Sequence, residues 1–330
     1  MASLPFTKAV YKTVDGHDID ARVYVPSTIL HPRCPVLINV HGGAFMLGAA
    51  GMVNADQVQD CLDRGWIVVV PNHRLCPQVN LLEGPMQDCR DLLSWIQDGK
   101  LEDHIARHDG GPYLVDVEYI FAFGTSSGGH LALSLGYGVQ RPVAGIYDMY
   151  GVCSFADAAW ADKLPHIQAL LPESLSQDIV DQVYNESPVP VEGGVSLEGQ
   201  AKPGPPDFSV PRVAFAFTQI GGGTVVDAIW PPSERGPEGN DFKAVDPLLN
   251  VTSTFPPTII VHGANDRMVP LRFSQQLYAE LQKNNVKSQL VEVPGEDHTF
   301  AAKMAVGSAT WNLQRQGFDF LEALLPRDDM

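Results

Sequence analysis

The positions of apolar residues along the chain predict strands that alternate with helices. Residues 10–14 and 19–25 alternate apolar and polar side chains on either side of Asp15-Gly16, which is typical of a β-hairpin. Short apolar runs follow at 36–40, 66–70, 119–123, 143–150, 258–263 and 289–293. The run at 36–40 predicts a strand that is buried on both faces of a sheet, and 66–70 predicts another buried strand. The other runs are predicted to be strands.

Apolar residues recur at helical spacing between these runs. In residues 85–98 they are Met86, Cys89, Leu92, Leu93 and Ile96, which is the pattern of an amphipathic helix. Further helices are predicted at 53–64, 130–135, 269–284 and 308–325. Because strands and helices alternate, the sequence predicts an α/β fold with a mostly parallel central sheet flanked by helices.

The pattern changes between residues 153 and 241. Short helices are predicted within 158–171 and 175–184, residues 187–211 are rich in Pro and Gly, and residues 211–230 are apolar. This composition is typical of an inserted segment rather than of another strand–helix repeat. We therefore expect an α/β core made of residues 1–152 and 242–330, with residues 153–241 as a cap or lid.

One predicted strand ends in Gly124-Thr-Ser-Ser-Gly128, and a helical segment follows. A Gly/Ser-rich loop matches this motif easily, so its context decides its meaning. A strand, a sharp turn and a helix in this order lift the central serine, Ser126, into a cleft. A bulky side chain at Gly124 or Gly128 would collide with the neighbouring strand or helix. We predict that Ser126 is a nucleophile.

The strand at 36–40 runs directly into His41-Gly-Gly-Ala-Phe45. Two glycines at this point let backbone N–H groups face a cleft without steric obstruction. The turn is either a plain exit from the strand or half of an oxyanion hole with the N–H groups of Gly43 and Ala44 as donors. The serine motif later in the chain favours the oxyanion hole.

A serine hydroxyl becomes a useful nucleophile only with a base beside it and a carboxylate that orients the base. Asp266 follows the strand at 258–263, and His298 follows the strand at 289–293. The order Ser, Asp, His is the one expected of a serine elbow on an α/β sheet. Because the last two strands should be neighbours, Asp266 and His298 are expected to meet above the sheet edge and reach Ser126.

Other candidates fit these roles less well. Asp227, Asp241 and Asp246 do not directly follow a strong strand signal, and the side chain of Asp297 should point away from the site. His73 and Arg74 precede the nucleophile in the chain, and we expect them to have structural roles, Arg74 as the anchor of a loop.

These pieces together resemble the α/β-hydrolases of the hormone-sensitive-lipase-like esterase group. The matching segments are His41-Gly-Gly-Ala-Phe, Gly124-Thr-Ser-Ser-Gly-Gly, Val261-His-Gly-Ala-Asn-Asp266 and Asp297-His298-Thr-Phe. The resemblance covers most of residues 20–150 and 244–325, and it implies that the N–H of Ser127 is a third oxyanion donor. The chain also loosely resembles hydrolases of fungal natural-product pathways.

Two positions depart from the usual pattern of that group. Ala44 replaces the third glycine of His-Gly-Gly-Gly, and Thr125-Ser-Ser replaces Asp-Ser-Ala around the nucleophile. A backbone donor survives the first change, but the methyl group of Ala44 narrows the cleft. Both changes affect the expected acyl specificity more than the expected mechanism.

Composition narrows the choice of partners. The chain has 22 Lys and Arg against 39 Asp and Glu, a net charge of −17, so we expect no nucleic-acid partner. We see no secretory signal and no run long enough for a transmembrane helix. Five scattered cysteines without CxxC spacing indicate a reduced, cytoplasmic protein. No metal-ligand spacing occurs, and no metal or cofactor is expected. The oligomeric state stays open, with a homodimer as one option.

The function predicted from these residues is a serine carboxylesterase that acts on a small or medium apolar ester. Aromatic residues could wall its substrate pocket, or they could form the core of the cap: Phe45, Phe155, Trp160, Phe215 and Trp230. An acyltransferase or a cyclase/lyase of a biosynthetic pathway would use the same triad, and so would an amidase. A ligand-binding receptor on a hydrolase fold is the alternative outside enzymology.

Overall fold

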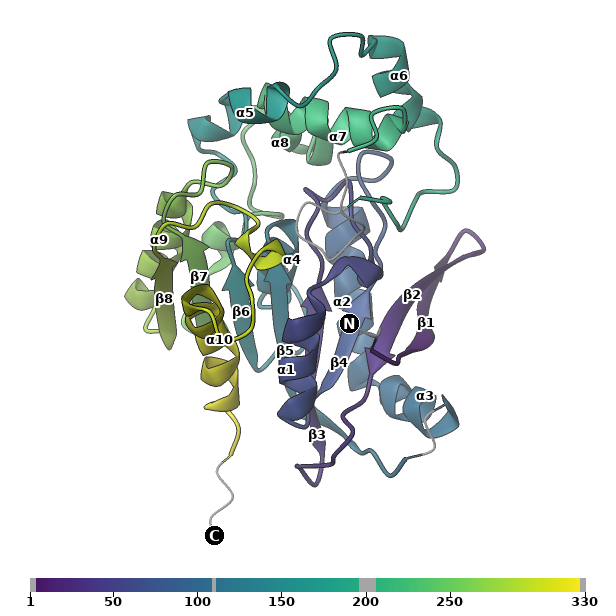
Figure 1. The fold of residues 1–330 in the computed structure, drawn as a ribbon, viewed down its shortest axis with the longest axis vertical. Coiled ribbons are helices and arrows are strands. Elements are labelled where there is room, and N and C mark those ends of the chain that lie inside the picture. The colour runs from purple at the N-terminus through teal and green to yellow at the C-terminus, as the bar shows by residue number, and fades with distance from the viewer. Residues whose placement is uncertain (1–3, 109–110, 196–205, 327–330) are drawn as a thin grey trace.

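The computed structural model describes residues 4–108, 111–195 and 206–326 of the 330-residue chain. An eight-stranded sheet in the order β1-β2-β4-β3-β5-β6-β7-β8 runs through the molecule (Figure 1). The strands are β1 Thr7–Val14, β2 His17–Tyr24, β3 Cys34–Val40, β4 Ile67–Pro71, β5 Val115–Thr125, β6 Gly145–Met149, β7 Thr258–Gly263 and β8 Ser288–Val293. Strand β2 pairs antiparallel with β1 and β4, and all other pairs are parallel. The predicted fold class is confirmed.

The sheet has a hydrophobic core on each face because successive side chains of a strand point to opposite sides. On β5, Phe121 and Phe123 belong to one core and Ala122 to the other. Helices α1 (Ala55–Asp63) and α10 (Ala309–Glu322) cover the face with the two phenylalanines. Helices α2 (Gln87–Gln97), α3 (Lys100–His108), α4 (Ser127–Ser134) and α9 (Leu271–Lys283) cover the other face.

Several short helices lie above the carboxyl ends of the strands (Figure 1). They are η3 Ala158–Ala161, α5 Pro165–Gln168, α6 Gln177–Asp181, η4 Gln182–Asn185, α7 Pro211–Gly222 and α8 Val225–Ile229. The helices η3, α5, α6 and η4 are shorter than the helices predicted within residues 158–171 and 175–184. The chain is extended at Asp162 and Leu164. At Leu164 the cause is Pro165, which disfavours a helical conformation of the residue before it. Residues 196–205 of the Pro- and Gly-rich stretch lie outside the described residues.

A buried arginine of α7 ties this region to the core. Arg212 is 3% exposed, and its guanidinium donates to the carbonyl oxygens of Met46 at 2.8 Å and Cys76 at 2.7 Å. The same guanidinium bonds the carboxylate of Glu186 at 2.5 Å and 2.8 Å. The backbone of Gly48 also pairs with this region, donating to Val195 O at 2.9 Å. The division of the chain at residues 153 and 241 stays a prediction.

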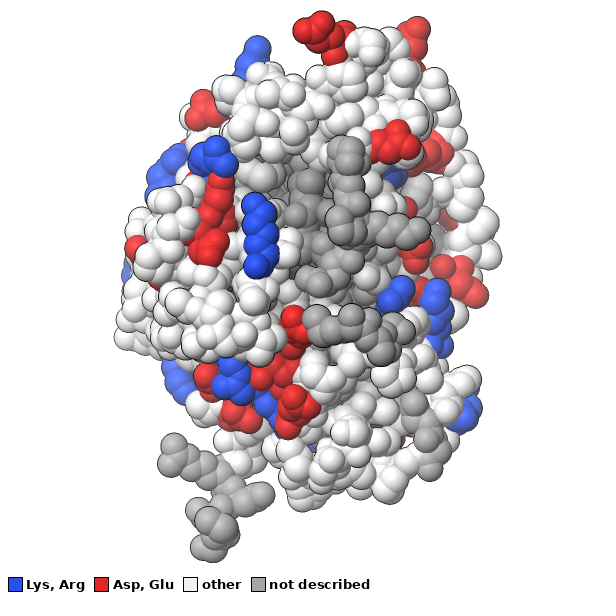
Figure 2. Space-filling model, viewed as in Figure 1, with Lys and Arg blue, Asp and Glu red and all other residues white. Residues whose placement is uncertain are grey.

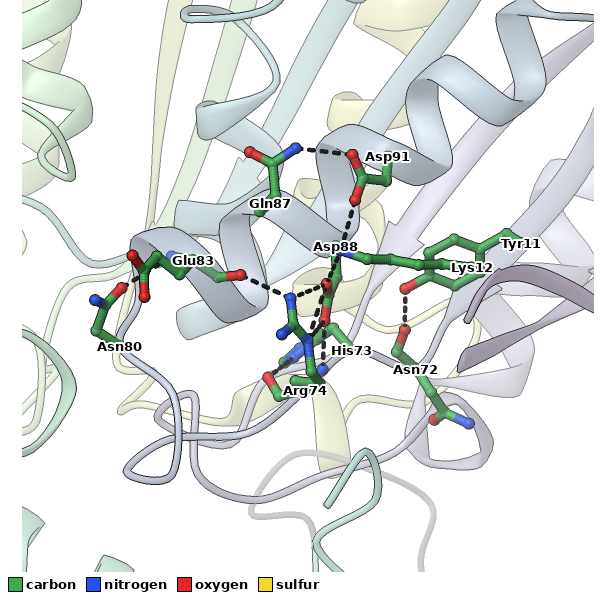
Figure 3. Close-up of polar contacts among 10 residues, drawn as sticks. All are labelled: Tyr11, Lys12, Asn72, His73, Arg74, Asn80, Glu83, Gln87, Asp88 and Asp91. Carbon is green, nitrogen blue, oxygen red and sulfur yellow. Dashed lines mark hydrogen bonds and ion pairs between the residues drawn. The ribbon is translucent and has the colours of Figure 1, made fainter. Parts of the chain in front are cut away.

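A polar cluster fixes the loop that follows β4 (Figure 3). The carboxylate of Asp88 on α2 is fully buried and accepts hydrogen bonds from the Arg74 guanidinium and from Lys12 Nζ on β1, both at 2.7 Å. Arg74 also donates to Glu83 O at 2.7 Å. Arg74 therefore anchors a loop, as predicted. Two residues further on, Cys76 N donates to Phe45 O at 2.9 Å, so this loop supports the chain after β3.

Acidic and basic side chains lie next to one another on the face shown in Figure 2. Within residues 4–108, 111–195 and 206–326, no helix has the length and apolar character needed to cross a membrane. The expectation that nucleic acid does not bind stays a prediction.

We expect Asp88→Asn to lower the free energy of unfolding by about 3 kcal/mol at neutral pH, because Arg74 and Lys12 would keep their charges without a buried partner. Burial acts to raise the pKa of Asp88, but hydrogen bonds from Arg74 and Lys12 outweigh it and hold the pKa below its usual value. The stabilisation is therefore present above the ordinary carboxyl pKa of about 4 and disappears as the pH falls through the lowered folded-state value.

Urea unfolding of Asp88→Asn and of the unaltered protein at pH 7 and in acid would check this expectation. The exposed Asp103→Asn is a charge-matched control and should change the unfolding free energy by less than about 0.5 kcal/mol. Equal losses in the two variants would contradict the assigned role of Asp88.

Candidate active site

Ser126 occupies a strained turn between β5 and α4. Its backbone has φ 53° and ψ −121°, a conformation that non-glycine residues rarely adopt. A Cβ atom added at Gly124 would lie 2.1 Å from Gly128 O, and one at Gly128 would lie 2.1 Å from Val40 O. These contacts confirm the steric reason predicted for both glycines. The turn places the hydroxyl at the carboxyl edge of the central strands.

The structure brings Ser126, His298 and Asp266 together. Ser126 Oγ lies 3.0 Å from His298 Nε2, and His298 Nδ1 lies 2.6 Å from Asp266 Oδ2. The three residues follow β5, β8 and β7 respectively, and β7 and β8 are neighbours in the sheet. The side chain of Asp266 is fully buried, and Ser126 and His298 are each 8% exposed. A hydroxyl, an imidazole and a carboxylate in this arrangement can transfer a proton away from the hydroxyl.

Asp266 is held as a carboxylate by several donors. Its Oδ1 accepts the backbone N–H groups of Met268 at 2.9 Å and Val269 at 2.8 Å. Burial acts to raise the pKa of Asp266, but the neighbouring imidazoles of His298 and His262 outweigh it and hold the pKa well below its usual value. The residue is thus ionised throughout the neutral range.

The other acidic candidates lie elsewhere. Asp246 accepts the backbone N–H groups of Ser154 and Phe155, while Asp227 pairs with Arg235. Asp241 accepts the N–H of Lys243. Asp297 bonds Arg267 and the backbone N–H of His298, so its carboxylate does not orient the imidazole ring.

The segment after β3 forms a tight turn beside Ser126. Gly43 has φ 128° and Ala44 has φ 53°, and Gly43 O accepts the N–H groups of Met46 and Leu47. A Cβ atom at Gly43 would lie 2.3 Å from Leu47 O, so this position needs glycine. Gly43 and Ala44 line the same cavity as Ser126. Ser127 is the first residue of α4, where the N–H has no partner within the helix.

His73 has a structural position and is not placed as a catalytic base. It stacks on His41 with ring centroids 4.6 Å apart, and both rings are buried. Burial lowers the pKa of His73, and burial together with the neighbouring ring lowers the pKa of His41 to about 3. The two neutral rings pack beneath the turn that follows β3.

The cavity above Ser126 is mostly apolar. Its empty space, including the space at its mouth, amounts to about 720 Å³. It is lined by Gly43, Ala44, Phe45, Ser126, Val152, Phe155, Ala159, Trp160, Asp162, Leu164, Ile220, Gly223, Val225, Met268, Val269 and His298. Phe45, Phe155 and Trp160 were among the residues predicted for this wall.

Phe215 and Trp230 do not line this cavity, which corrects the predicted pocket. The ring of Phe215 packs edge-on against Tyr184, and Trp230 donates its indole N–H to Asp241 O at 3.1 Å. Both residues pack within the region between residues 153 and 241, the alternative that the sequence left open. Several lining residues, such as Ile220 and Val225, were not predicted, because short apolar helices carry no signal for which side faces a cavity.

In the described part of the chain, no group of three or more His, Cys, Asp or Glu residues is placed to hold a metal ion. All five cysteines are buried and free. Burial raises the pKa of the Cys76 thiol to about 12, which leaves it protonated and unreactive at neutral pH.

Two protein families match separate parts of the chain. Residues 21–143 match the BD-FAE family, and residues 228–325 match the prolyl oligopeptidase family. Among solved structures, esterase 2 of Thermogutta terrifontis has a TM-score of 0.62 at 18% identity, with 98% of each chain covered. A protein of unknown function from Staphylococcus aureus has a TM-score of 0.66 at 19% identity, covering 96% of this chain and 99% of that one.

The chain has the α/β-hydrolase fold. The predicted resemblance to proteins of this fold is thereby confirmed. The prolyl oligopeptidase match also supports the prediction that this α/β-hydrolase is an enzyme of the serine hydrolase class. The family matches themselves name BD-FAE and prolyl oligopeptidase rather than the hormone-sensitive-lipase-like group.

Curated relatives of this α/β-hydrolase are fungal synthases. The non-reducing polyketide synthase Preu6 of Preussia isomera is 28% identical over 94% of this chain, and the methylphloroacetophenone synthase of Cladonia uncialis is 27% identical over 97% of it. The chain spans only 14% and 13% of the length of these two proteins. The similarity agrees with the predicted resemblance to proteins of fungal natural-product pathways.

We expect Gly128→Ala to reduce the reaction of Ser126 with a fluorophosphonate by about tenfold or more, because the new methyl group would displace the serine turn from β3. Thermal unfolding and the labelling rate, followed by intact mass, would measure both consequences. Gly222→Ala is the matched control, since its Cβ would meet only Thr224 Oγ1, at 3.6 Å. Labelling of Gly128→Ala at the rate of the unaltered protein would contradict this account of the turn.

Proposed function

We propose that the chain is a serine esterase that works through an acyl-enzyme on Ser126. The observation that carries the proposal is the 3.0 Å contact between Ser126 Oγ and His298 Nε2, with Asp266 at 2.6 Å from the other ring nitrogen. This chain of contacts lies at a strained turn in the floor of an apolar cavity. Neighbouring structures of esterases support the same activity.

The proposed reaction begins when His298 takes the proton of Ser126 and the serine oxygen attacks the carbonyl carbon of the ester. The carbonyl oxygen becomes an oxyanion, which the N–H groups of Gly43, Ala44 and Ser127 stabilise. His298 then gives its proton to the departing alcohol, and an acyl group stays on Ser126. A water molecule, deprotonated by His298, releases the acid.

The cavity supports a small or medium apolar substrate. Its walls are aliphatic and aromatic side chains, and Asp162 is the only carboxylate that lines it within the described residues. We propose that residues 153–241 act as a cap whose short helices form the upper wall. Arg212 supports this role, since its buried contacts hold α7 against the loops beside the active site.

A second candidate is transfer of the acyl group to an alcohol or amine in a polyketide pathway, with a cyclase/lyase as a variant. Similarity to synthases such as Preu6 and the apolar cavity, which disfavours water, support this candidate. The amidase and the ligand-binding receptor stay weaker alternatives. A cytoplasmic location, proposed from the five free cysteines, accords with both main candidates.

We expect Ser126→Ala to lower the hydrolysis of p-nitrophenyl esters by roughly 10⁴-fold or more with no loss of fold. A series of graded acyl chains would give kcat/KM for each ester, and thermal unfolding would serve as the control for folding. Full turnover by Ser126→Ala would contradict the mechanism. Absence of ester turnover together with fluorophosphonate labelling of Ser126 would favour acyl transfer, which product analysis with a competing alcohol or amine would then detect.

We also expect Trp160 to limit the length of the acyl chain. Its indole N–H donates to Ser154 O at 3.1 Å, and its ring stacks on Phe273 with centroids 5.4 Å apart. A second hollow, lined in part by Val226 and Phe242, shares Phe155, Trp160 and Gly223 with the substrate cavity. The indole of Trp160 therefore separates the substrate cavity from the second hollow.

Trp160→Ala should raise kcat/KM for long-chain esters relative to short-chain esters by about tenfold or more, because the two spaces would join. Trp160→Phe keeps a ring at this position and should change the ratio much less. Equal ratios in all three proteins would show that Trp160 does not set the depth of the pocket.

A further inference from the structure

A second histidine contacts the carboxylate of Asp266. His262 lies on β7, four residues before Asp266, and is fully buried. Its Nε2 lies 3.1 Å from Asp266 Oδ2 and 2.9 Å from Val269 O, and its Nδ1 lies 2.7 Å from Ser274 Oγ on α9. No step of the proposed reaction uses this residue.

The neighbours of His262 determine where its proton lies. Both atoms that face Nε2, a carboxylate oxygen and a carbonyl oxygen, are acceptors only. Nε2 therefore carries a hydrogen, which it donates to Val269 O, and the nitrogen itself lies 3.1 Å from Asp266 Oδ2. Nδ1 faces a hydroxyl, which donates a hydrogen bond to the neutral ring. His262 thus presents a fixed donor to Asp266.

His262 and His298 share one oxygen. Asp266 Oδ2 receives His298 Nδ1 at 2.6 Å and His262 Nε2 at 3.1 Å, while Oδ1 is occupied by two backbone N–H groups. A polarised N–H group close to the same carboxylate oxygen attracts part of the negative charge that would otherwise act on the base. The carboxylate then stabilises the protonated form of His298 less than it would alone.

We propose that His262 is a positioning residue that sets the basicity of His298 through the shared oxygen of Asp266. The proposal deepens the esterase proposal, on which it rests. The second donor stops the carboxylate from rotating, and it keeps His298 neutral, and so able to accept the serine proton, at a lower pH than Asp266 alone would allow.

Other groups that face this site come from neighbouring elements. Tyr150, after β6, places its ring 4.9 Å from the ring of His298 and 6.4 Å from that of His262. Asp297 is paired with Arg267 and accepts the backbone N–H of His298. Both Asp297 and Arg267 lie toward the surface, where solvent screens their effect on the buried pair. His262 and His298 are the titratable groups within hydrogen-bond reach of Asp266 in the described residues.

The test uses His262→Phe, which removes the donor but keeps a ring, and His262→Gln, which keeps an amide donor near the position of Nε2. Ser274→Ala is the control for packing, because it removes the Nδ1 contact and leaves the contact with Asp266. The measurement is the rate of fluorophosphonate labelling of Ser126 against pH, which needs no substrate turnover.

In His262→Phe, the pH at which labelling falls to half its maximum should rise by about one unit, because His298 then binds its proton more tightly. The maximum labelling rate should also fall, since Asp266 is less well fixed. His262→Gln and Ser274→Ala should keep the half-maximal pH of the unaltered protein. An unchanged half-maximal pH in His262→Phe would overturn the proposal, as would an equal rise in Ser274→Ala.

If His262→Phe does not fold, nitrogen-15 NMR of the unaltered protein tests the role of His262 instead. The proposal requires hydrogen on Nε2 of His262 from pH 6 to pH 8, and an Nδ1–H tautomer would overturn it. Absence of labelling at every pH in the unaltered protein would count against the esterase proposal, and the NMR spectrum would still decide the role of His262.

Discussion

The hydrogen bond between Ser126 and His298 depends on a turn that holds Ser126 at a positive φ. Such a backbone is unfavourable for serine, and the surrounding packing maintains it. Gly124 and Gly128 approach the carbonyl oxygens of Gly128 and Val40 so closely that no other residue fits. The parallel pairing of β3, β5 and β6 then fixes the turn at the centre of the sheet. The geometry of the site therefore depends on the sheet as well as on the three side chains.

Buried polar groups also hold the segments that surround this turn. Asp88 holds the loop after β4 through Arg74 and Lys12, and that loop pairs with Phe45 in the turn after β3. Arg212 joins the same two segments to α7. Asp88 and Arg212 are buried, and each has a partner of opposite sign, so these contacts restrain the loops that shape the cavity.

Much of the fold was predictable because local signals agree with the tertiary structure. Strands β3, β4, β6 and β7 are apolar runs buried on both faces, whereas the edge strand β8 has exposed residues. The chain order of Ser126, Asp266 and His298 matches the ends of β5, β7 and β8. The region between residues 153 and 241 was less predictable. Its short helices depend on packing, and Phe215 and Trp230 contact Tyr184 and Asp241 and do not line the cavity. Helix α3 was also missed, since only Leu101 and Ile105 mark its apolar face. The partners of Asp88 and His262 lie on other elements, so no sequence spacing reveals them.

The central claim is that Ser126, activated by His298, attacks a carbonyl carbon whose oxygen is held by the turn after β3. A crystal structure of the protein after reaction with a fluorophosphonate tests it most directly. The account predicts a phosphorus–oxygen bond at Ser126 Oγ, with a phosphonyl oxygen within hydrogen-bond distance of the N–H groups of Gly43, Ala44 and Ser127. An adduct on another residue, or a phosphonyl oxygen directed away from these groups, would contradict the account.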